Sequence, residues 1–168
     1  MEESVWRRFA FFLVGYLDSD QTWLRRLTKN SDIEQGAIVT AHFNSNYKSL
    51  EPLLGNTSSD KIQAVQADLR VEDDVVKLFS SAQHTFGSVQ IIVVNHAISV
   101  VKDDNLWEMS LDRWRTTIDT NLTSSFLVTR EYLRQLKTAS LDSKEKASII
   151  FIGSTAGKYG ELIPFFFA

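Results

Sequence analysis

Polar side chains follow several of the apolar runs in this sequence. Asp68 comes after the run at 61–67, Asn95-His96-Ala97 begin where the run at 89–94 ends, and Ser154 comes after the run at 148–152. Carboxylate, amide, imidazole and hydroxyl groups bind polar ligands, move protons or stabilise developing charge. One further amide, Asn121, stands inside a helical pattern. Each of these side chains also has a structural interpretation, as a cap, a turn residue or a partner of the local backbone.

The apolar runs that must position these side chains alternate with helical patterns. Buried strands are expected over residues 37–43, 61–67, 89–94 and 148–152. A helix is expected over residues 72–85, and a further helical pattern runs on to residue 136 behind Ser110, its expected N-cap. The apolar face of the first helix is Val75, Val76, Leu78, Phe79 and Ala82, and Gly87 is its expected C-cap.

An alternation of strand and helix favours an α/β fold with an open, doubly wound parallel sheet, Rossmann-like and incomplete. The carboxyl ends of parallel strands meet at one edge of such a sheet. Ligands of this architecture bind beyond that edge. We therefore expect Asp68, Asn95 and Ser154 to lie around one site.

Composition narrows the class of protein. The chain has 168 residues, of which 43% are apolar and 23% charged, with a formal net charge of −3. These values are typical of one globular domain, and the acidic balance gives no reason to expect nucleic acid as a partner. Because the chain has no cysteine, it forms no disulfide and no zinc–thiolate site. We expect a cytoplasmic protein without a metal.

An apolar run at Phe9–Leu17 lies behind Arg7 and Arg8. It is too short to cross a bilayer, which takes about 20 residues, and no small-residue cleavage site follows it. We therefore expect a buried strand or helix here, and no membrane anchor.

Three segments of the second half match the motifs of one known family in order and spacing. They read IIVVNHAIS at 91–99, DTNLTSSFLVTREYL at 119–133 and SIIFIGSTAGKYGE at 148–161. In this arrangement the chain resembles the short-chain dehydrogenases/reductases, whose members bind NAD(P) and act on small carbonyl or alcohol substrates. The resemblance covers residues 36–161. We accordingly expect a partial NAD(P)-binding Rossmann-like domain over 36–168, preceded by an atypical segment, 1–35, of unknown role.

The resemblance implies catalytic roles for Ser154 and Asn121. The hydroxyl of Ser154 would donate a hydrogen bond to the substrate carbonyl oxygen. Asn121, together with a local distortion of its helix, would hold a water that relays protons.

The resemblance also implies a cofactor site. Asp68 and the backbone amide of Leu69 would meet the adenine edge, and Asn95-His96-Ala97 would line the ribose. In this turn His96 replaces a small residue and Ala97 replaces the usual glycine. A general-base role is the alternative for His96, and we favour a positional role of its backbone.

Two parts of the family's motif set have no counterpart in the sequence. The family's proton donor is a Tyr-x-x-x-Lys pair, but Phe167 stands at the place expected for the tyrosine. A glycine-rich turn for the pyrophosphate is expected near residues 18–25, which read DSDQTWLR. We therefore expect a chain truncated at both ends of the motif set, catalytically incompetent and with impaired cofactor binding.

The end of the second strand bears on the choice of cofactor. Residues 42–46 read HFNSN, without the acid that binds the ribose hydroxyls in NAD-dependent relatives. This favours NADP over NAD, with Lys48 near its 2′-phosphate.

Three hypotheses follow for function. By lineage the chain is an NADP-preferring carbonyl reductase, similar to the 3-oxoacyl-carrier-protein reductases. Alternatively it is a non-catalytic nucleotide-binding or regulatory fragment, which forms a homo- or hetero-oligomer with a full-length relative through the helix around 121–136. The third hypothesis is an unstable truncated product.

Overall fold

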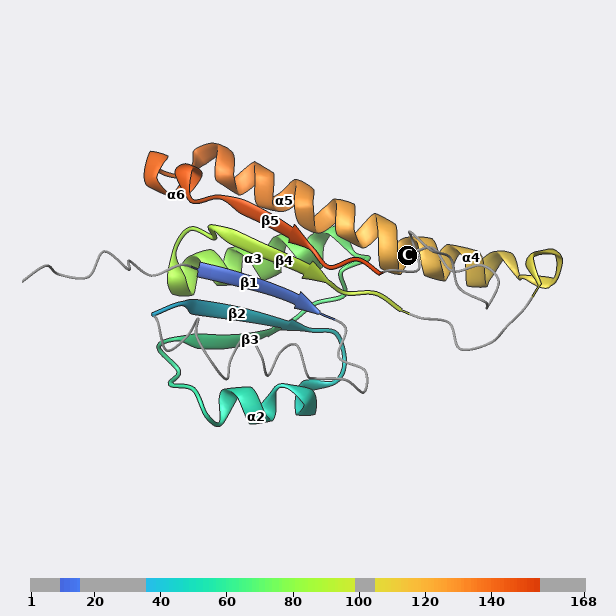
Figure 1. Ribbon diagram of the computed structural model, residues 1–168, viewed down its shortest axis with the longest axis horizontal. Helices are drawn as coiled ribbons and strands as arrows, with labels where there is room; N and C mark the ends of the chain where they lie inside the picture. The colour runs from blue at the N-terminus through green and yellow to red at the C-terminus, as the bar shows by residue number, and fades with distance from the viewer. Residues whose placement is uncertain (1–9, 16–35, 99–104, 155–168) are drawn as a thin grey trace, which may run out of the picture.

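A computed structural model describes residues 36–98 and 105–154, together with the backbone of residues 10–15. In this part of the chain five parallel strands form one sheet in the order β3-β2-β1-β4-β5 (Figure 1). The strands are β1 (Ala10–Gly15), β2 (Ile38–Phe43), β3 (Ile62–Gln66), β4 (Ile91–Asn95) and β5 (Ser148–Phe151). The predicted parallel α/β sheet is confirmed.

Helices connect these strands. The described α-helices are α2 (Glu51–Leu54), α3 (Glu72–Phe86), α4 (Leu111–Ile118), α5 (Ser124–Thr138) and α6 (Leu141–Glu145). Two short 3-10 helices, η1 (Tyr47–Ser49) and η2 (Leu106–Glu108), and one π-helical turn, η3 (Asp119–Thr123), complete the set.

Two predicted helix ends are confirmed. The hydroxyl of Ser110 accepts a hydrogen bond from the amide of Arg113 and so caps α4. Gly87 follows α3 with a φ of 87°, a conformation that side chains other than glycine rarely adopt. Local sequence chemistry therefore sets both ends.

Strand β1 corrects the expected division of the chain at residue 36. It lies inside the sheet and pairs with β2 on one side and β4 on the other. An apolar run suits a strand with neighbours on both sides, so the run at Phe9–Leu17 supplies a central strand. The sheet thus includes residues 10–15, while 1–9 and 16–35 lie outside the described residues.

Helices cover both faces of the sheet. On one face α3 lies against β2 and β3, α5 lies against β4, and the two helices contact each other; their buried side chains include Phe79, Val128 and Tyr132. On the other face Leu53 of α2 and the preceding Leu50 pack against β2 and β3. This arrangement is that of a doubly wound fold. The predicted apolar face of α3 is buried except for Val76, which is exposed.

The Tyr132 hydroxyl donates a hydrogen bond of 2.5 Å to the carbonyl oxygen of Gln90, within this core. The same oxygen accepts from the amide of Ser148 at 3.0 Å. Helix α5 is thereby linked to the segment that precedes β4 and to the start of β5.

We expect Tyr132→Phe to lower the free energy of unfolding by about 1 kcal/mol, because one buried hydrogen bond is lost while the Gln90 oxygen keeps its second donor. Urea denaturation measures the change. Tyr47→Phe, at an exposed tyrosine of η1, is the matched control. Equal stabilities of the two variants would show that the bond contributes nothing.

Candidate functional site

The strand order reverses between β1 and β4, since β2 and β3 lie on one side of β1 and β4 and β5 on the other. Open α/β sheets bind their ligands in the crevice beyond the carboxyl ends of the strands at such a reversal. Gly15 at the end of β1 lies opposite Asn95 at the end of β4. The predicted turn Asn95-His96-Ala97 therefore begins at the switch point.

The side chain of Asn121 joins this turn to the π-helical turn η3. Its Oδ1 accepts a hydrogen bond from the amide of Ile98 at 2.8 Å, and its Nδ2 donates to the carbonyl of Ile98 at 3.1 Å. The helix distortion that the resemblance implied is present as η3. The structural alternative, an asparagine bonded to the backbone of its own helix, is wrong because the partner is 23 residues away.

Two serines at the start of α5 continue this network. Ser124 Oγ donates to the carbonyl of Thr120 at 2.5 Å, and Ser125 Oγ donates to the carbonyl of Asn121 at 2.7 Å. His96 Nε2 lies 2.5 Å from Ser124 Oγ. Because both hydroxyl hydrogens are directed at carbonyls, the hydrogen of this contact must come from His96. His96 is therefore assigned as the neutral Nε2–H tautomer.

Burial controls the chemistry of His96. The ring is 7% exposed. Desolvation, with a smaller contribution from His42, lowers the pKa of His96 to about 4. A general base works best with a pKa near the operating pH, so this histidine is poorly suited to that role. Its side chain instead attaches the loop after β4 to α5.

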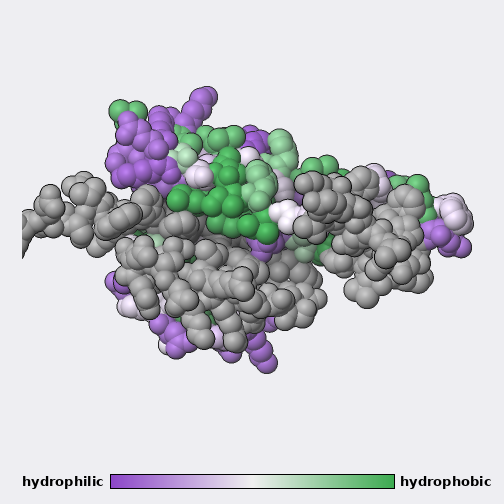
Figure 2. Space-filling view, in the orientation of Figure 1, coloured by the Kyte–Doolittle hydropathy of each residue, from purple (hydrophilic) through white to green (hydrophobic). Residues whose placement is uncertain are grey.

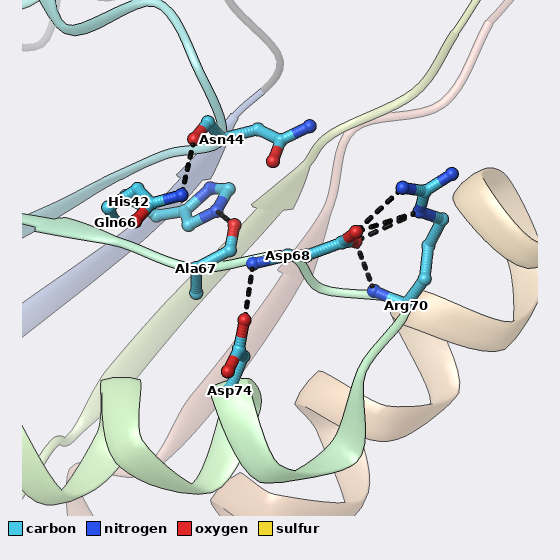
Figure 3. A network of polar contacts seen from close by, with 7 residues as sticks. All are labelled: His42, Asn44, Gln66, Ala67, Asp68, Arg70 and Asp74. Carbon is cyan, nitrogen blue, oxygen red and sulfur yellow. Dashed lines mark hydrogen bonds and ion pairs between the residues drawn. The ribbon is translucent and has the colours of Figure 1, made fainter.

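Asp68 lies beyond the carboxyl end of β3 and faces Arg70 (Figure 3). Its carboxylate accepts from the Arg70 amide at 3.0 Å, which is the turn-forming role of an aspartate, and from the guanidinium at 2.6 Å. The hydrogen bonds from Arg70 lower the pKa of Asp68 below its usual value. The Leu69 side chain is buried in the core, so only its backbone is placed to meet a ligand.

Ser154 and Ala97 are exposed. The amide of Ile152 donates to the carbonyl of Val94 at 3.0 Å, which places the segment leading to Ser154 beside the end of β4. The contacts described above join His96, Asn121 and Ile98; they do not include Asp68 or Ser154. Phe167 and residues 18–25 lie outside the described residues.

Strand β5 departs from the expectation of a buried strand. Phe151 is 58% exposed, and Ile150 and Ile152 are also exposed. An apolar run predicts a strand, but its burial depends on what packs against it. Figure 2 shows this hydrophobic surface over β5.

Sequence reasoning missed Arg70, Ser124, Ser125 and the backbone of Ile98. The two serines stand one helical turn after Thr120 and Asn121, a spacing at which hydroxyls bond carbonyls. Arg70 stands two residues after Asp68, close enough to pair with it. The role of Ile98 carries no sequence signal, because any residue supplies the same backbone groups.

The residues that the structure describes contain no group of three or more histidine, cysteine or carboxylate side chains arranged to hold a metal ion. None of their helices has the length and apolar character needed to span a membrane.

The doubly wound sheet and the polar turn at its switch point define a Rossmann-like α/β protein. The family model for short chain dehydrogenases matches residues 28–163. The chain therefore belongs to the short-chain dehydrogenase family.

Two curated relatives are similar over part of their length. A short-chain type dehydrogenase/reductase from Picea abies is 30% identical over 111 residues, which are 61% of this chain and 41% of the relative. The 3-oxoacyl-acyl-carrier-protein reductase MabA from Mycobacterium avium is 33% identical over 106 residues, which are 63% of this chain and 39% of the relative. The chain thus matches about two fifths of the length of these relatives.

Solved structures share the fold. A short-chain dehydrogenase/reductase (glucose/ribitol dehydrogenase) from Brucella melitensis aligns with a TM-score of 0.70 at 20% identity, over 92% of this chain and 60% of that one. A short chain dehydrogenase from Mycobacterium smegmatis aligns with a TM-score of 0.71 at 19% identity, over 94% of this chain and 63% of that one. At this sequence identity the similarity to the two solved structures shows the fold alone.

The burial of His96 predicts a pH dependence of stability. In the unfolded chain His96 binds its proton near the ordinary pKa of 6.5, but in the folded chain only near 4. Between these values the unfolded state binds more protons, so the free energy of unfolding falls as the pH falls. We expect wild type to lose about 2 kcal/mol more than His96→Asn between pH 7 and pH 4.5.

Urea denaturation at a series of pH values measures this difference. His84→Asn, on the exposed surface of α3, tests the effect of the substitution itself. Parallel pH profiles of wild type and His96→Asn would contradict a buried, neutral His96.

Proposed function

We propose that this chain carries the cofactor half-site of a short-chain oxidoreductase that prefers NADP over NAD. The parent enzyme would act on a small carbonyl or alcohol, in the manner of a 3-oxoacyl reductase. The observation that carries the proposal is the pair of hydrogen bonds between the Asn121 side chain and the backbone of Ile98. It ties the loop at the switch point of the sheet to the helix turn expected to hold the catalytic asparagine.

The residues at the carboxyl edge of the sheet suit a dinucleotide. Asn95 is half-buried and Ala97 is exposed at the switch point, so this turn offers polar groups to a ribose. Asp68 and the Leu69 amide would meet the adenine. Lys48 is exposed in η1, beyond a β2 end that carries no acid, and this favours the 2′-phosphate of NADP. When bound, the nicotinamide cofactor supplies or accepts the hydride.

The catalytic roles fall to Ser154 and Asn121. The exposed hydroxyl of Ser154 would donate to the carbonyl oxygen of the substrate. Asn121 would position a water through the π turn that it stabilises. Both roles fit the polar edge of the sheet.

The proton donor is the part that this sequence does not provide. None of its tyrosines, Tyr16, Tyr47, Tyr132 and Tyr159, is followed four residues later by a lysine. Burial raises the pKa of Tyr132, and its hydroxyl is bonded inside the core. We therefore propose that these 168 residues bind cofactor, with reduced affinity, and do not turn substrate over. We further propose a cytoplasmic location, which suits a chain without cysteine.

A second proposal is that the chain pairs with a second copy of this fold through α5. Leu122, Phe126 and Leu133 are exposed and line a groove of about 600 Å³ together with Phe151 of β5. Exposed apolar patches of this kind mark interaction sites.

Fluorescence titration with NADPH tests the cofactor site. We expect saturable binding at micromolar concentrations, weaker binding of NADH, and about tenfold weaker binding of NADPH to Asn95→Ala, the effect of one lost hydrogen bond. Asn105→Ala, at an exposed asparagine before η2, is the control. A folded chain that binds neither nucleotide, or one that reduces a ketone with NADPH, would contradict the proposal.

Sedimentation velocity tests the pairing through α5. We expect the wild-type chain to dimerise and Phe126→Glu to remain monomeric, because the substitution places a charge in the apolar groove. Leu141→Glu, at a similarly exposed leucine of α6, controls for the added charge. A monomeric wild-type chain would refute the pairing.

A further inference from the structure

The carboxylate of Asp68 accepts several hydrogen bonds from Arg70 of its own chain. Its Oδ1 accepts from the Arg70 amide at 3.0 Å and from Nε at 2.9 Å. Its Oδ2 accepts from Nε at 3.2 Å and from Nη2 at 2.6 Å (Figure 3). A carboxylate has about four acceptor positions. Arg70 directs three hydrogens at these positions, because its single Nε hydrogen is shared between the two oxygens.

The backbone beneath this pair is fixed independently of Arg70. The amide of Asp68 donates to Asp74 Oδ2 at 3.2 Å, and the preceding carbonyl, of Ala67, lies 2.8 Å from Nε2 of the buried His42. The backbone of Asp68 is therefore held in place even when the Arg70 side chain moves away. The Arg70 side chain is 46% exposed, so it is the partner that is free to move into solvent.

The Asp68–Arg70 ion pair has favourable geometry but contributes little free energy. The guanidinium contacts both carboxylate oxygens, a charge-assisted arrangement that a neutral amine does not match. Since both side chains are partly exposed, solvent screening leaves such a pair with little net stabilisation. A ligand group can bind Asp68 only by displacing Arg70. The free energy of that displacement offsets most of the ligand's own hydrogen bond.

We propose that Arg70 controls adenine recognition at Asp68, by competing with the exocyclic amine of the adenine ring for the carboxylate. This inference rests on the proposed cofactor site. In the wild-type chain the amine contributes little to affinity, because Arg70 already uses most of the acceptor positions. When Arg70 is removed, Asp68 becomes available and the protein distinguishes purines that carry the amine from those that lack it.

The test compares NADPH with its deamino analogue, in which hypoxanthine replaces adenine and the exocyclic amine becomes a carbonyl oxygen. The readout is the ratio of the two dissociation constants, measured for wild type and Arg70→Ala by fluorescence titration. Loss of the positive charge of Arg70 affects the phosphates of both ligands equally, so it cancels in the ratio. Contacts of the Leu69 amide with the ring also cancel between the two proteins.

We expect the preference for NADPH over its deamino analogue to rise by up to about fivefold in Arg70→Ala relative to wild type, the cost of displacing a partly exposed ion pair. Lys77→Ala is the matched control. It removes the same charge from another exposed ion pair nearby, Lys77 with Asp74 at 3.3 Å, and should leave the ratio unchanged. An unchanged or smaller ratio in Arg70→Ala overturns the proposal.

A second measurement separates this inference from the proposed function. The Asp68 carboxyl is titrated by carbon NMR in wild type and Arg70→Ala, without any nucleotide. We expect its pKa to be lowered in wild type and to rise when Arg70 is removed. Equal pKa values in the two proteins would refute the pairing itself. A raised pKa in Arg70→Ala, with no nucleotide bound by any variant, would refute both the cofactor site and the competition for adenine.

Discussion

Two hydrogen bonds between the Asn121 side chain and the backbone of Ile98 set the geometry of the site. Ile98 follows β4 at the switch point of the sheet, where its half-buried amide and carbonyl have no strand to pair with. Buried backbone groups need partners, and one asparagine supplies both. The π turn at 119–123 and the loop after β4 therefore form one unit. His96, Ser124 and Ser125 extend that unit into α5.

The contacts around Asn121 and His96 are rigid, whereas those around Asp68 can exchange partners. Around Asn121 and His96 the polar groups are largely buried, and breaking their contacts leaves unsatisfied atoms. Around Asp68 the contacts are partly exposed ion pairs, which contribute little to stability and exchange partners easily. Under the proposed function, a nucleotide would meet a preformed turn after β4 and would share the Asp68 carboxylate with Arg70.

The sheet and its helices were largely predictable from the sequence. Strands β2 to β5 lie close to the apolar runs, α3 ends before Gly87, and α4 begins after Ser110, as periodicity and capping residues predict. The helical pattern predicted to run on to residue 136 is divided by η3 into α4 and α5. Strand β1 was set apart from the domain because its run has no glycine-rich turn after it. Pairing with β2 and β4, which local sequence does not reveal, makes it central.

Parts of the candidate site could not be predicted because they depend on contacts between distant segments. The bonding of Asn121 to the backbone of Ile98 and the tautomer of His96 both depend on groups of other elements. The exposure of Phe151 depends on the surroundings of β5. By contrast, the pairing of Asp68 with Arg70 is local, and the spacing of the two residues could have revealed it.

Hydrogen exchange at the Ile98 amide, followed by NMR, tests the central contact most directly. Asn121→Ala removes the partner of that amide, and Asn56→Ala removes an exposed asparagine bonded only to its own turn. Our account predicts that Ile98 exchanges at least about tenfold faster in Asn121→Ala and at the wild-type rate in Asn56→Ala, while the amides of β2 stay protected in both. An Ile98 amide equally protected in all three proteins would contradict the account.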